Sequence, residues 1–486
     1  MRTIGTPSTQ VRKLNAIASG TLPSGDPVVV NADGTVSVVG ESIATSLSSG
    51  TPVVFEAATT YYTACAYDAN AQKIVIAYRD DGNSSRGTAI IGTVSGTSIS
   101  FGSPAVFETG AAYPESVVYD SIAQKVVITY PDYGNGGYGT AVVGTVSGTT
   151  ISFGVPVVFE SANSTGPRAV YDSNAQKVVI AYTDGGNSSY GTAIVGTVSG
   201  ASISFGSPTV YETANSYFKS IAYDANASKV VIAYADLGNS TYGTAIVGTV
   251  SGTSISFGTA AIFNGAGSSY YSSISYDANA QKVVVFYQDG SNSGYGTANV
   301  GTISGTSISF GAKSVFSSSS MGPSASTYAS NSNQTVVAFN DSGDSSKGKV
   351  AAGTISGTSI SFSSPLTFQN SSSDYFGIAY DSNAERVVAS YNDAGNSTHG
   401  TSCVILTRTA VTNLTSENYI GIASNGYNDT KAATIDVQGA INDRQSGLTA
   451  GQSYYVQADG TLTTTAGSPS VFAGTAVSAT KMIVKG

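Results

Sequence analysis

The sequence contains no tryptophan, one histidine and two cysteines, and only 10% of its 486 residues are charged. Because His399 is the single histidine, a Ser-His-Asp or Cys-His catalytic site has one available centre, and catalysis finds little support. Cys65 and Cys403 form no C-x-x-C pair, which argues against a thiolate zinc site. We therefore expect a protein without enzyme activity, metal or cofactor.

Basic clusters and long apolar runs are also missing. The 21 basic and 30 acidic residues leave a formal charge of −9, so nucleic acid is a poor partner, and so is an anionic membrane. No run of about 18 apolar residues occurs, so we expect no membrane insertion. The segment from Met1 to Gly20 lacks the apolar stretch of a signal peptide, and export by the secretory route is not expected.

What the chain does contain is glycine, tyrosine and β-branched residues, a mixture typical of all-β proteins. A tyrosine, usually followed by aspartate, returns every 52 or 53 residues and marks seven repeats. These marker tyrosines are Tyr67, Tyr119, Tyr171, Tyr223, Tyr276, Tyr328 and Tyr380. Downstream of them the stretch GTAIVGTVSGTSISFGSP returns almost unchanged.

Each repeat carries four strand signals separated by turns. In the second repeat these are ESVVYD from Glu115, KVVITY from Lys125, TAVVGTV from Thr140, and TISFG continuing through Pro156 to VVFE. Four antiparallel strands repeated seven times predict a seven-bladed β-propeller, in which neighbouring blades bury each other's faces. The alternative is a linear solenoid, which would need polar end caps, and a ring explains the two ends of the array better.

The seventh repeat lacks its fourth strand, and a matching segment stands before the first repeat. GESIATSLSSGTPVVFE (residues 40–56) aligns without gaps with GTVSGTSISFGSPAVFE (residues 92–108). We predict that residues 41–410 form the propeller, with the ring closed by a strand from 41–56. The first and last repeats are neighbours in a ring, so Cys65 and Cys403 are either two buried thiols or a disulfide.

The flanks of the repeats contain a duplication of their own. Residues 22–35 read LPSGDPVVVNADGT and residues 448–461 read LTAGQSYYVQADGT. A softer match links IGIA from Ile420 with AGTA from Ala473. We predict a small β anchoring domain of two units, built from residues 1–40 and 411–486. The first unit is interrupted by the whole propeller, and the second runs from about residue 446 to the end.

The C-terminal run SGLTAGQSYYVQADGTLTTTAGSPSVFAGTAVSATKMIVKG, with the N-terminal 40 residues, resembles modules of tailed-bacteriophage virion proteins. The likeness is to tail-fibre and head-decoration proteins of marine phages. It implies a virion surface protein assembled in the host cytoplasm, with the small domain attached to the particle and the propeller displayed outward. It also implies other virion proteins as partners, and many copies or a homo-oligomer on the particle.

An aspartate opens the loop after each second strand, in a motif close to D-x-G-N-S. These aspartates are Asp80, Asp132, Asp184, Asp236, Asp289, Asp341 and Asp393. A calcium ion would need about six to eight oxygen ligands, more than one Asp and one Asn per loop supply. We expect these side chains to stabilise the turns instead.

Two sets of tyrosines are candidate ligand-binding residues. The first stands six residues before the marker tyrosine, or five in the last repeat: Tyr61, Tyr113, Tyr217, Tyr270 and Tyr375. The second, the pre-glycine set, precedes a fixed glycine in the loop after the second strand: Tyr138, Tyr190, Tyr242 and Tyr295. Alternate loops of an antiparallel blade emerge on one face, where tyrosines suit contacts with sugars or proteins. The alternative interpretation is that these tyrosines pack between blades.

Two functions fit these patterns. The first is a virion adhesin whose propeller binds a host-surface glycan or receptor, and the second is a purely structural decoration or connector protein. Propeller sialidases are the enzymatic alternative. They resemble this chain in fold only, because their S-x-D-x-G-x-x-W box is absent, as is tryptophan altogether.

Overall fold

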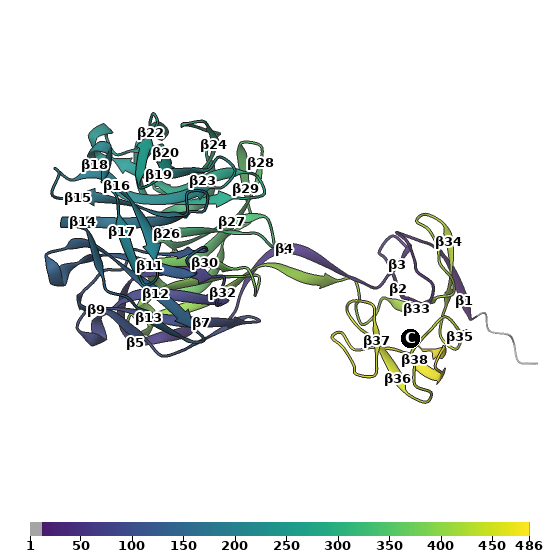
Figure 1. Cartoon of the computed structure of the whole chain (residues 1–486). Coiled ribbons are helices and arrows are strands. Elements are labelled where there is room, and N and C mark those ends of the chain that lie inside the picture. The colour runs from purple at the N-terminus through teal and green to yellow at the C-terminus, as the bar shows by residue number, and fades with distance from the viewer. Residues whose placement is uncertain (1–11, 486) are drawn as a thin grey trace, which may run out of the picture. The chain divides into compact units, whose positions relative to one another are not determined.

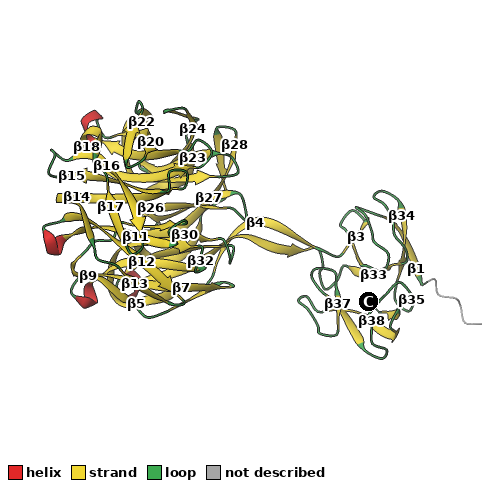
Figure 2. Ribbon diagram, viewed as in Figure 1, coloured by secondary structure: helices red, strands yellow, loops and turns green. Residues whose placement is uncertain are grey.

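The computed structural model describes residues 12–485, and strands make up most of it (Figure 1). Figure 2 shows that helical turns are short and confined to loops. The chain divides into two compact units, one formed by residues up to Ala44 together with those from Thr409, the other by Thr45–Arg408. No helix among the described residues is long and apolar enough to cross a membrane.

The unit Thr45–Arg408 is built from the repeats, each contributing four kinds of strand. The long strands run from the outer edge of one repeat to the inner edge of the next. They are β5 (Val53–Asp68), β14 (Val157–Asp172), β18 (Thr209–Asp224), β22 (Ala261–Asp277), β26 (Ser314–Ala329) and β30 (Leu366–Asp381), with β9 (Ala105–Ala111) and β10 (Ser116–Asp120) in place of one long strand around Pro114.

The second strands each end at the loop aspartate. They are β6 (Lys73–Asp80), β11 (Lys125–Asp132), β15 (Lys177–Asp184), β19 (Lys229–Asp236), β23 (Lys282–Asp289), β27 (Gln334–Asp341) and β31 (Arg386–Asp393). Short 3-10 turns follow five of them: η1 (Asp81–Asn83), η2 (Tyr133–Asn135), η3 (Leu237–Asn239), η4 (Gly290–Asn292) and η5 (Ala394–Asn396).

The third strands return antiparallel to the second. They are β7 (Arg86–Ser95), β12 (Tyr138–Ser147), β16 (Tyr190–Ser199), β20 (Tyr242–Ser251), β24 (Tyr295–Ser304), β28 (Lys347–Ser356) and β32 (His399–Thr412). Short fourth strands follow: β8 (Ser98–Phe101), β13 (Thr150–Phe153), β17 (Ser202–Phe205), β21 (Ser254–Phe257), β25 (Ser307–Phe310) and β29 (Ser359–Phe362). The seventh repeat has no such hairpin, and β4 (Glu41–Ser49) pairs with β32 in its place.

The pairing order passes through 29 strands in chain sequence, from β10 to β32, then through β4 and β5 to β9. Its two ends, β9 and β10, are consecutive in the chain. β32 also pairs directly with the start of β5, with Thr401 opposite Val54. The segment before the first repeat therefore lies beside the last repeat.

The core of this unit lies between neighbouring repeats. Each apolar cluster joins two repeats, and one contains Phe55, Ile74 and Val388, which come from the first and seventh repeats. A tyrosine of the second strand is fully buried in most repeats, as at Tyr78. Its hydroxyl donates a hydrogen bond of 3.1 Å to Oε2 of Glu56 on the adjoining strand.

The repeated turn residues have direct structural reasons. Asp68, which follows a marker tyrosine, accepts hydrogen bonds from the backbone N–H groups of Asn70 (3.0 Å) and Ala71 (2.9 Å) and so holds the hairpin turn. The fixed glycine after the pre-glycine residue packs under an aromatic ring. A Cβ at Gly87 would lie 2.5 Å from the ring of Phe107, so only glycine fits there.

The other unit holds two five-stranded sheets of matching order. The first is β1 (Lys13–Ile17), β34 (Ala432–Asp436), β33 (Tyr419–Ala423), β2 (Pro27–Val30) and β3 (Val36–Val38). The second is β35 (Ile441–Asn442), β39 (Lys481–Val484), β38 (Val471–Ser478), β36 (Ser453–Val456) and β37 (Leu462–Thr463). The duplicated segments 22–35 and 448–461 occupy equivalent places in the two sheets, and the second sheet begins at Ile441, earlier than residue 446. Val29 and Val456 share one apolar cluster.

Candidate functional site

Seven equivalent positions, each five residues before a marker tyrosine, surround one cavity. They are Tyr62, Pro114, Gly166, Phe218, Tyr271, Pro323 and Tyr375, and all seven line the cavity. Its volume is about 410 Å³, within the range of about 300–1,000 Å³ that is usual for small-molecule sites. We call it the central cavity.

The backbone at these positions turns the side chain toward the cavity. Tyr62, Phe218, Tyr271 and Tyr375 have φ values of 52°, 46°, 53° and 54°, in the left-handed region. The strand pairing is irregular at the same places, for example between Tyr61 and Ala64. Such bulges re-aim a side chain, and a bulky residue with positive φ is strained, a feature that concentrates at functional sites.

Aromatic side chains gather around the cavity and form what we call the aromatic rim: Tyr62, Tyr113, Tyr133, Tyr217, Phe218, Tyr271 and Tyr375. The ring centroid of Tyr62 lies 4.6 Å from that of Tyr113 and 4.9 Å from that of Tyr375. Phe218 lies 4.8 Å from Tyr271 and 5.0 Å from Tyr217. The rim therefore consists of two packed aromatic groups.

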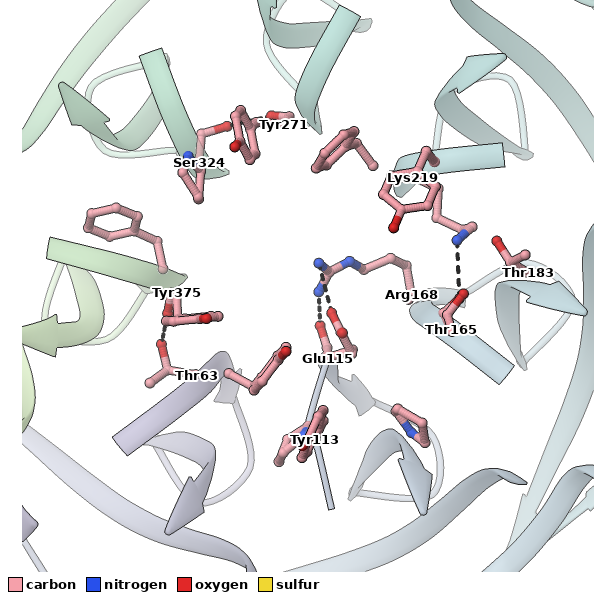
Figure 3. A pocket seen from close by; sticks show the side chains of 18 of the residues that line it. Thr63, Tyr113, Glu115, Thr165, Arg168, Thr183, Lys219, Tyr271, Ser324 and Tyr375 are labelled. Atoms are coloured by element: carbon pink, nitrogen blue, oxygen red, sulfur yellow. Dashed lines mark hydrogen bonds and ion pairs between the residues drawn. The ribbon is translucent and has the colours of Figure 1, made fainter. Parts of the chain in front are cut away.

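Charged groups lie among these rings. The Arg168 guanidinium makes an ion pair of 3.0 Å with Oε2 of Glu115 and also donates to the Glu115 carbonyl oxygen. Lys219, only 5% exposed, donates a hydrogen bond of 3.2 Å to the carbonyl oxygen of Thr165. Burial, and then the charge of Arg168, lower the pKa of Lys219 to about 7, against an opposing effect of Glu115. Figure 3 shows these side chains, with Tyr113, Tyr271 and Tyr375, arranged around one opening.

A second cavity of about 180 Å³ shares Glu115 and Arg168 with the first. Small polar side chains line much of it, including Ser116, Ser220 and Ser273. The charged pair therefore lies where the two cavities adjoin.

The first candidate tyrosine set divides between lining and supporting positions. Tyr113, Tyr217 and Tyr375 line the central cavity. Tyr61 packs edge-on against Tyr375, with centroids 5.3 Å apart, and Tyr270 packs edge-on against Phe218 at 5.6 Å. Neither Tyr61 nor Tyr270 is among the lining residues. Ligand binding by the set stays a prediction.

The pre-glycine tyrosines lie elsewhere. Tyr138, Tyr190, Tyr242 and Tyr295 are half-buried, and each begins a third strand. They pair with residues of the next long strand, as Tyr138 does with Asn163. None of the four lines the central cavity, and their role in binding also stays a prediction.

Sequence reasoning missed Tyr62, Phe218, Tyr271, Arg168 and Lys219 as site residues. One signal was available, because Tyr375 stands five residues before its marker tyrosine while the rest of its set stands six before. In all seven repeats, the residue that stands five before the marker tyrosine lines the cavity. Arg168 and Lys219 carried no signal, since each occurs once at its repeat position.

Both cysteines are free, so the disulfide alternative is wrong. The Cys65 sulfur lies 2.7 Å from Oγ of Ser390, and Cys403 donates to the Gly50 carbonyl oxygen at 3.4 Å. Burial raises the pKa of each thiol to about 12.

The loop aspartates act in turns at several repeats. Asp236 accepts a hydrogen bond of 2.9 Å from the Gly238 N–H, and Asp393 accepts one of 3.0 Å from the Gly395 N–H. Within residues 12–485 no group of three or more His, Cys, Asp or Glu side chains is placed to hold a metal ion.

No protein-family model matches the chain, and neither does any curated protein. Among solved structures, the BP39L lectin from Burkholderia pseudomallei is similar, with 11% identity over 73% of this chain and 98% of that one, at a TM-score of 0.53. This likeness shows the fold alone: an all-β, β-propeller-like chain.

Two further structures match more loosely. One is a protein of unknown function from Dyadobacter fermentans, with 12% identity over 74% of this chain and 99% of that one and a TM-score of 0.45. The other is the SapL1 lectin in complex with alpha methyl fucoside, with 12% identity, 63% and 96% coverage and a TM-score of 0.40.

Proposed function

We propose that this protein is a non-enzymatic, lectin-like glycan-binding protein whose repeats form a closed seven-bladed β-propeller. The observation that carries the proposal is the aromatic rim around a cavity of about 410 Å³ that also holds charged hydrogen-bonding groups. Aromatic faces suit the apolar faces of sugar rings, and polar groups among them suit the hydroxyls. The fold similarity to a lectin agrees with it.

Three features support a closed ring of seven blades. The strand order starts and ends at β9 and β10, which are neighbours in the chain. β4 stands where the seventh repeat lacks its fourth strand. One apolar cluster joins the first and seventh repeats. A closed propeller leaves only short, protected sheet edges, which guards such sheets against aggregation.

The cavity favours binding over glycoside hydrolysis. Of the described residues lining it, Glu115 alone carries a carboxylate, and that carboxylate is paired with Arg168. Most glycosidases use two carboxyl groups, about 5–10 Å apart. A single paired carboxylate fits a binding role.

The setting we propose is the surface of a phage particle, on the strength of the resemblance of the terminal segments to virion modules. There the small β unit would attach to other virion proteins, and the propeller would bind host glycans. Many copies on one particle would turn weak single contacts into firm attachment through avidity. The alternative is a purely structural decoration protein that binds no glycan.

A glycan array tests the binding proposal. The full chain is compared with a Tyr62→Asn/Tyr375→Asn variant, since asparagine tolerates positive φ better than most residues do. The matched control is Ile122→Asn/Val155→Asn, at two exposed side chains outside the cavity lining. We expect the full chain and the control to retain the same glycans and the rim variant to lose them. Absence of any retained glycan, or equal binding by the rim variant, contradicts the proposal.

A further inference from the structure

Lys219 places a positive charge at the central cavity, and a neutral sugar offers no charge to pair with it. Lys219 lines the cavity, and its ammonium has one hydrogen-bond acceptor among the described residues, the Thr165 carbonyl oxygen. A protonated lysine carries three donors, so two remain free. The nearest carboxylate of the lining, Glu115, is already paired with Arg168. The cavity thus contains one cation without a carboxylate partner.

We propose that the central cavity binds a sugar bearing a carboxylate, a uronic or sialic acid, with the carboxylate held by Lys219 and the sugar ring against the aromatic rim. The proposal rests on the proposed function and names its ligand class. Arg168, which lies between the two cavities, has donors left beyond its bonds to Glu115 and can share the same carboxylate.

The electrostatics of the cavity also favour an acidic ligand. A buried charge without a partner is unfavourable, so burial lowers the pKa of Lys219 to about 7. A ligand carboxylate beside the ammonium offsets the cost of burial and raises that pKa again. Binding of an acidic sugar should therefore take up a proton near neutral pH, whereas binding of a neutral sugar should not.

Other ionisable groups around Lys219 are few. Arg168 and Glu115 are the charged groups of the lining that face it. The phenols of Tyr62, Tyr271 and Tyr375 have raised pKa values because of burial, so they stay neutral at physiological pH. Asp374, next to Tyr375, also has a raised pKa through burial. If the pH dependence of binding is lost in the Lys219→Met variant, it comes from the lysine and not from Asp374.

The test is calorimetric titration of the full chain with three methyl glycosides: methyl glucuronide, methyl sialoside and methyl glucoside as the neutral counterpart. We expect at least one acidic glycoside to bind about tenfold or more tightly than the glucoside at pH 6. Lys219→Met should remove the preference. Lys177→Met, a lysine that begins β15 and lines neither cavity, should keep it.

The pH dependence needs no variant and covers the case in which Lys219→Met fails to fold. With a lysine pKa near 7, affinity for the acidic glycoside should fall about tenfold from pH 6 to pH 8, because the protonated fraction falls from about nine-tenths to one-tenth. Equal affinity for acidic and neutral glycosides, a preference that survives Lys219→Met, or a flat pH profile overturns the proposal while the glycan-binding function stands. If no saccharide binds in the array or the titration, the proposed function fails and the acidic ligand fails with it.

Discussion

The rings of Tyr62 and Tyr113 are stacked, with centroids 4.6 Å apart and an interplanar angle of 16°, although they occupy different positions of their repeats. Tyr62 stands five residues before its marker tyrosine and Tyr113 six before. In the second repeat Pro114 holds the place of Tyr62, and proline cannot adopt the positive φ found there. Two different local backbones therefore bring tyrosines to one rim.

The left-handed backbone at the rim gives a first prediction, on stability. At Tyr271, with φ 53°, valine should be less tolerated than asparagine, because β-branched residues are strained at positive φ. We expect the free energy of unfolding of Tyr271→Val to be about 1 kcal/mol lower than that of Tyr271→Asn. Both variants lose the same contact with Phe218, so the difference reports the backbone. Denaturant titration measures it, and equal stabilities would mean that the positive φ is not present in solution.

The half-buried carboxylate of Glu160 gives a second prediction, on pH. Burial, and then the charge of Asp184, raise the pKa of Glu160, which accepts a hydrogen bond from the Tyr182 hydroxyl at 3.2 Å. The folded state then binds the proton more tightly than the unfolded state does. Ionisation of Glu160 therefore destabilises the fold as the pH rises through the pKa of the unfolded state and then through the raised pKa of the folded state. At low pH, where the carboxyl group is protonated in both states, this penalty is absent.

Glu160→Gln should remove this penalty. The seventh repeat already has glutamine at the equivalent position, where Nε2 of Gln369 donates a hydrogen bond of 2.6 Å to Oδ2 of Asp393. We expect a gain of no more than about 0.5 kcal/mol at pH 8, because solvent screens this half-buried group, and the gain should vanish near pH 4. Thermal melting of both proteins across this range measures it. A loss of stability at pH 8 would show that the charged form of Glu160 is favourable.

The repeated architecture followed from the sequence because the strand and turn signals are local. The marker tyrosine with its aspartate, as at Asp68, encodes a hairpin turn whose hydrogen bonds involve the next three residues only. The ungapped match of residues 40–56 to a fourth strand likewise pointed to the pairing of β4 with β32.

The binding cavity was less accessible to sequence reasoning. Positive φ at Tyr62 or Tyr271 has no residue signature, because tyrosine rarely adopts it. Counting from the marker tyrosine therefore selected Tyr61 and Tyr270, one residue away from the lining. Lys219 looked like an ordinary strand residue, since its neighbours Arg168 and Glu115 come from other repeats.

The thiols provide a third prediction, on reactivity. Thiolate is the reactive form, and burial raises the pKa of both Cys65 and Cys403 to about 12. At pH 8 the native protein should react with a disulfide reagent at least about 100-fold more slowly than the same protein in urea. The absorbance of the coloured thiol released from the reagent, followed with time, measures both rates. Rapid reaction of the native protein would contradict the raised pKa values of the two thiols, and a disulfide detected under non-reducing conditions would contradict their free state.

The last prediction concerns the proposed closure of the ring of repeats by β4, which lies between β32 and β5 in the strand order. Removing the whole N-terminal segment would also remove β1 to β3, so a point variant is the sharper test. Leu47 on β4 packs against the apolar cluster that contains Cys403 and Ile405. Leu47→Asp should destabilise the repeats by about 2–3 kcal/mol, because a carboxylate then replaces an apolar contact in the closing strand.

Thr45→Asp is the matched control, since Thr45 lies on the same strand with its side chain exposed. We expect it to melt within about 0.5 kcal/mol of the unmodified protein, as surface substitutions usually do. Leu47→Asp should also aggregate on warming, since loss of β4 exposes the unpaired edge of β32. If both variants melt as the unmodified protein does, β4 does not close the proposed ring of repeats.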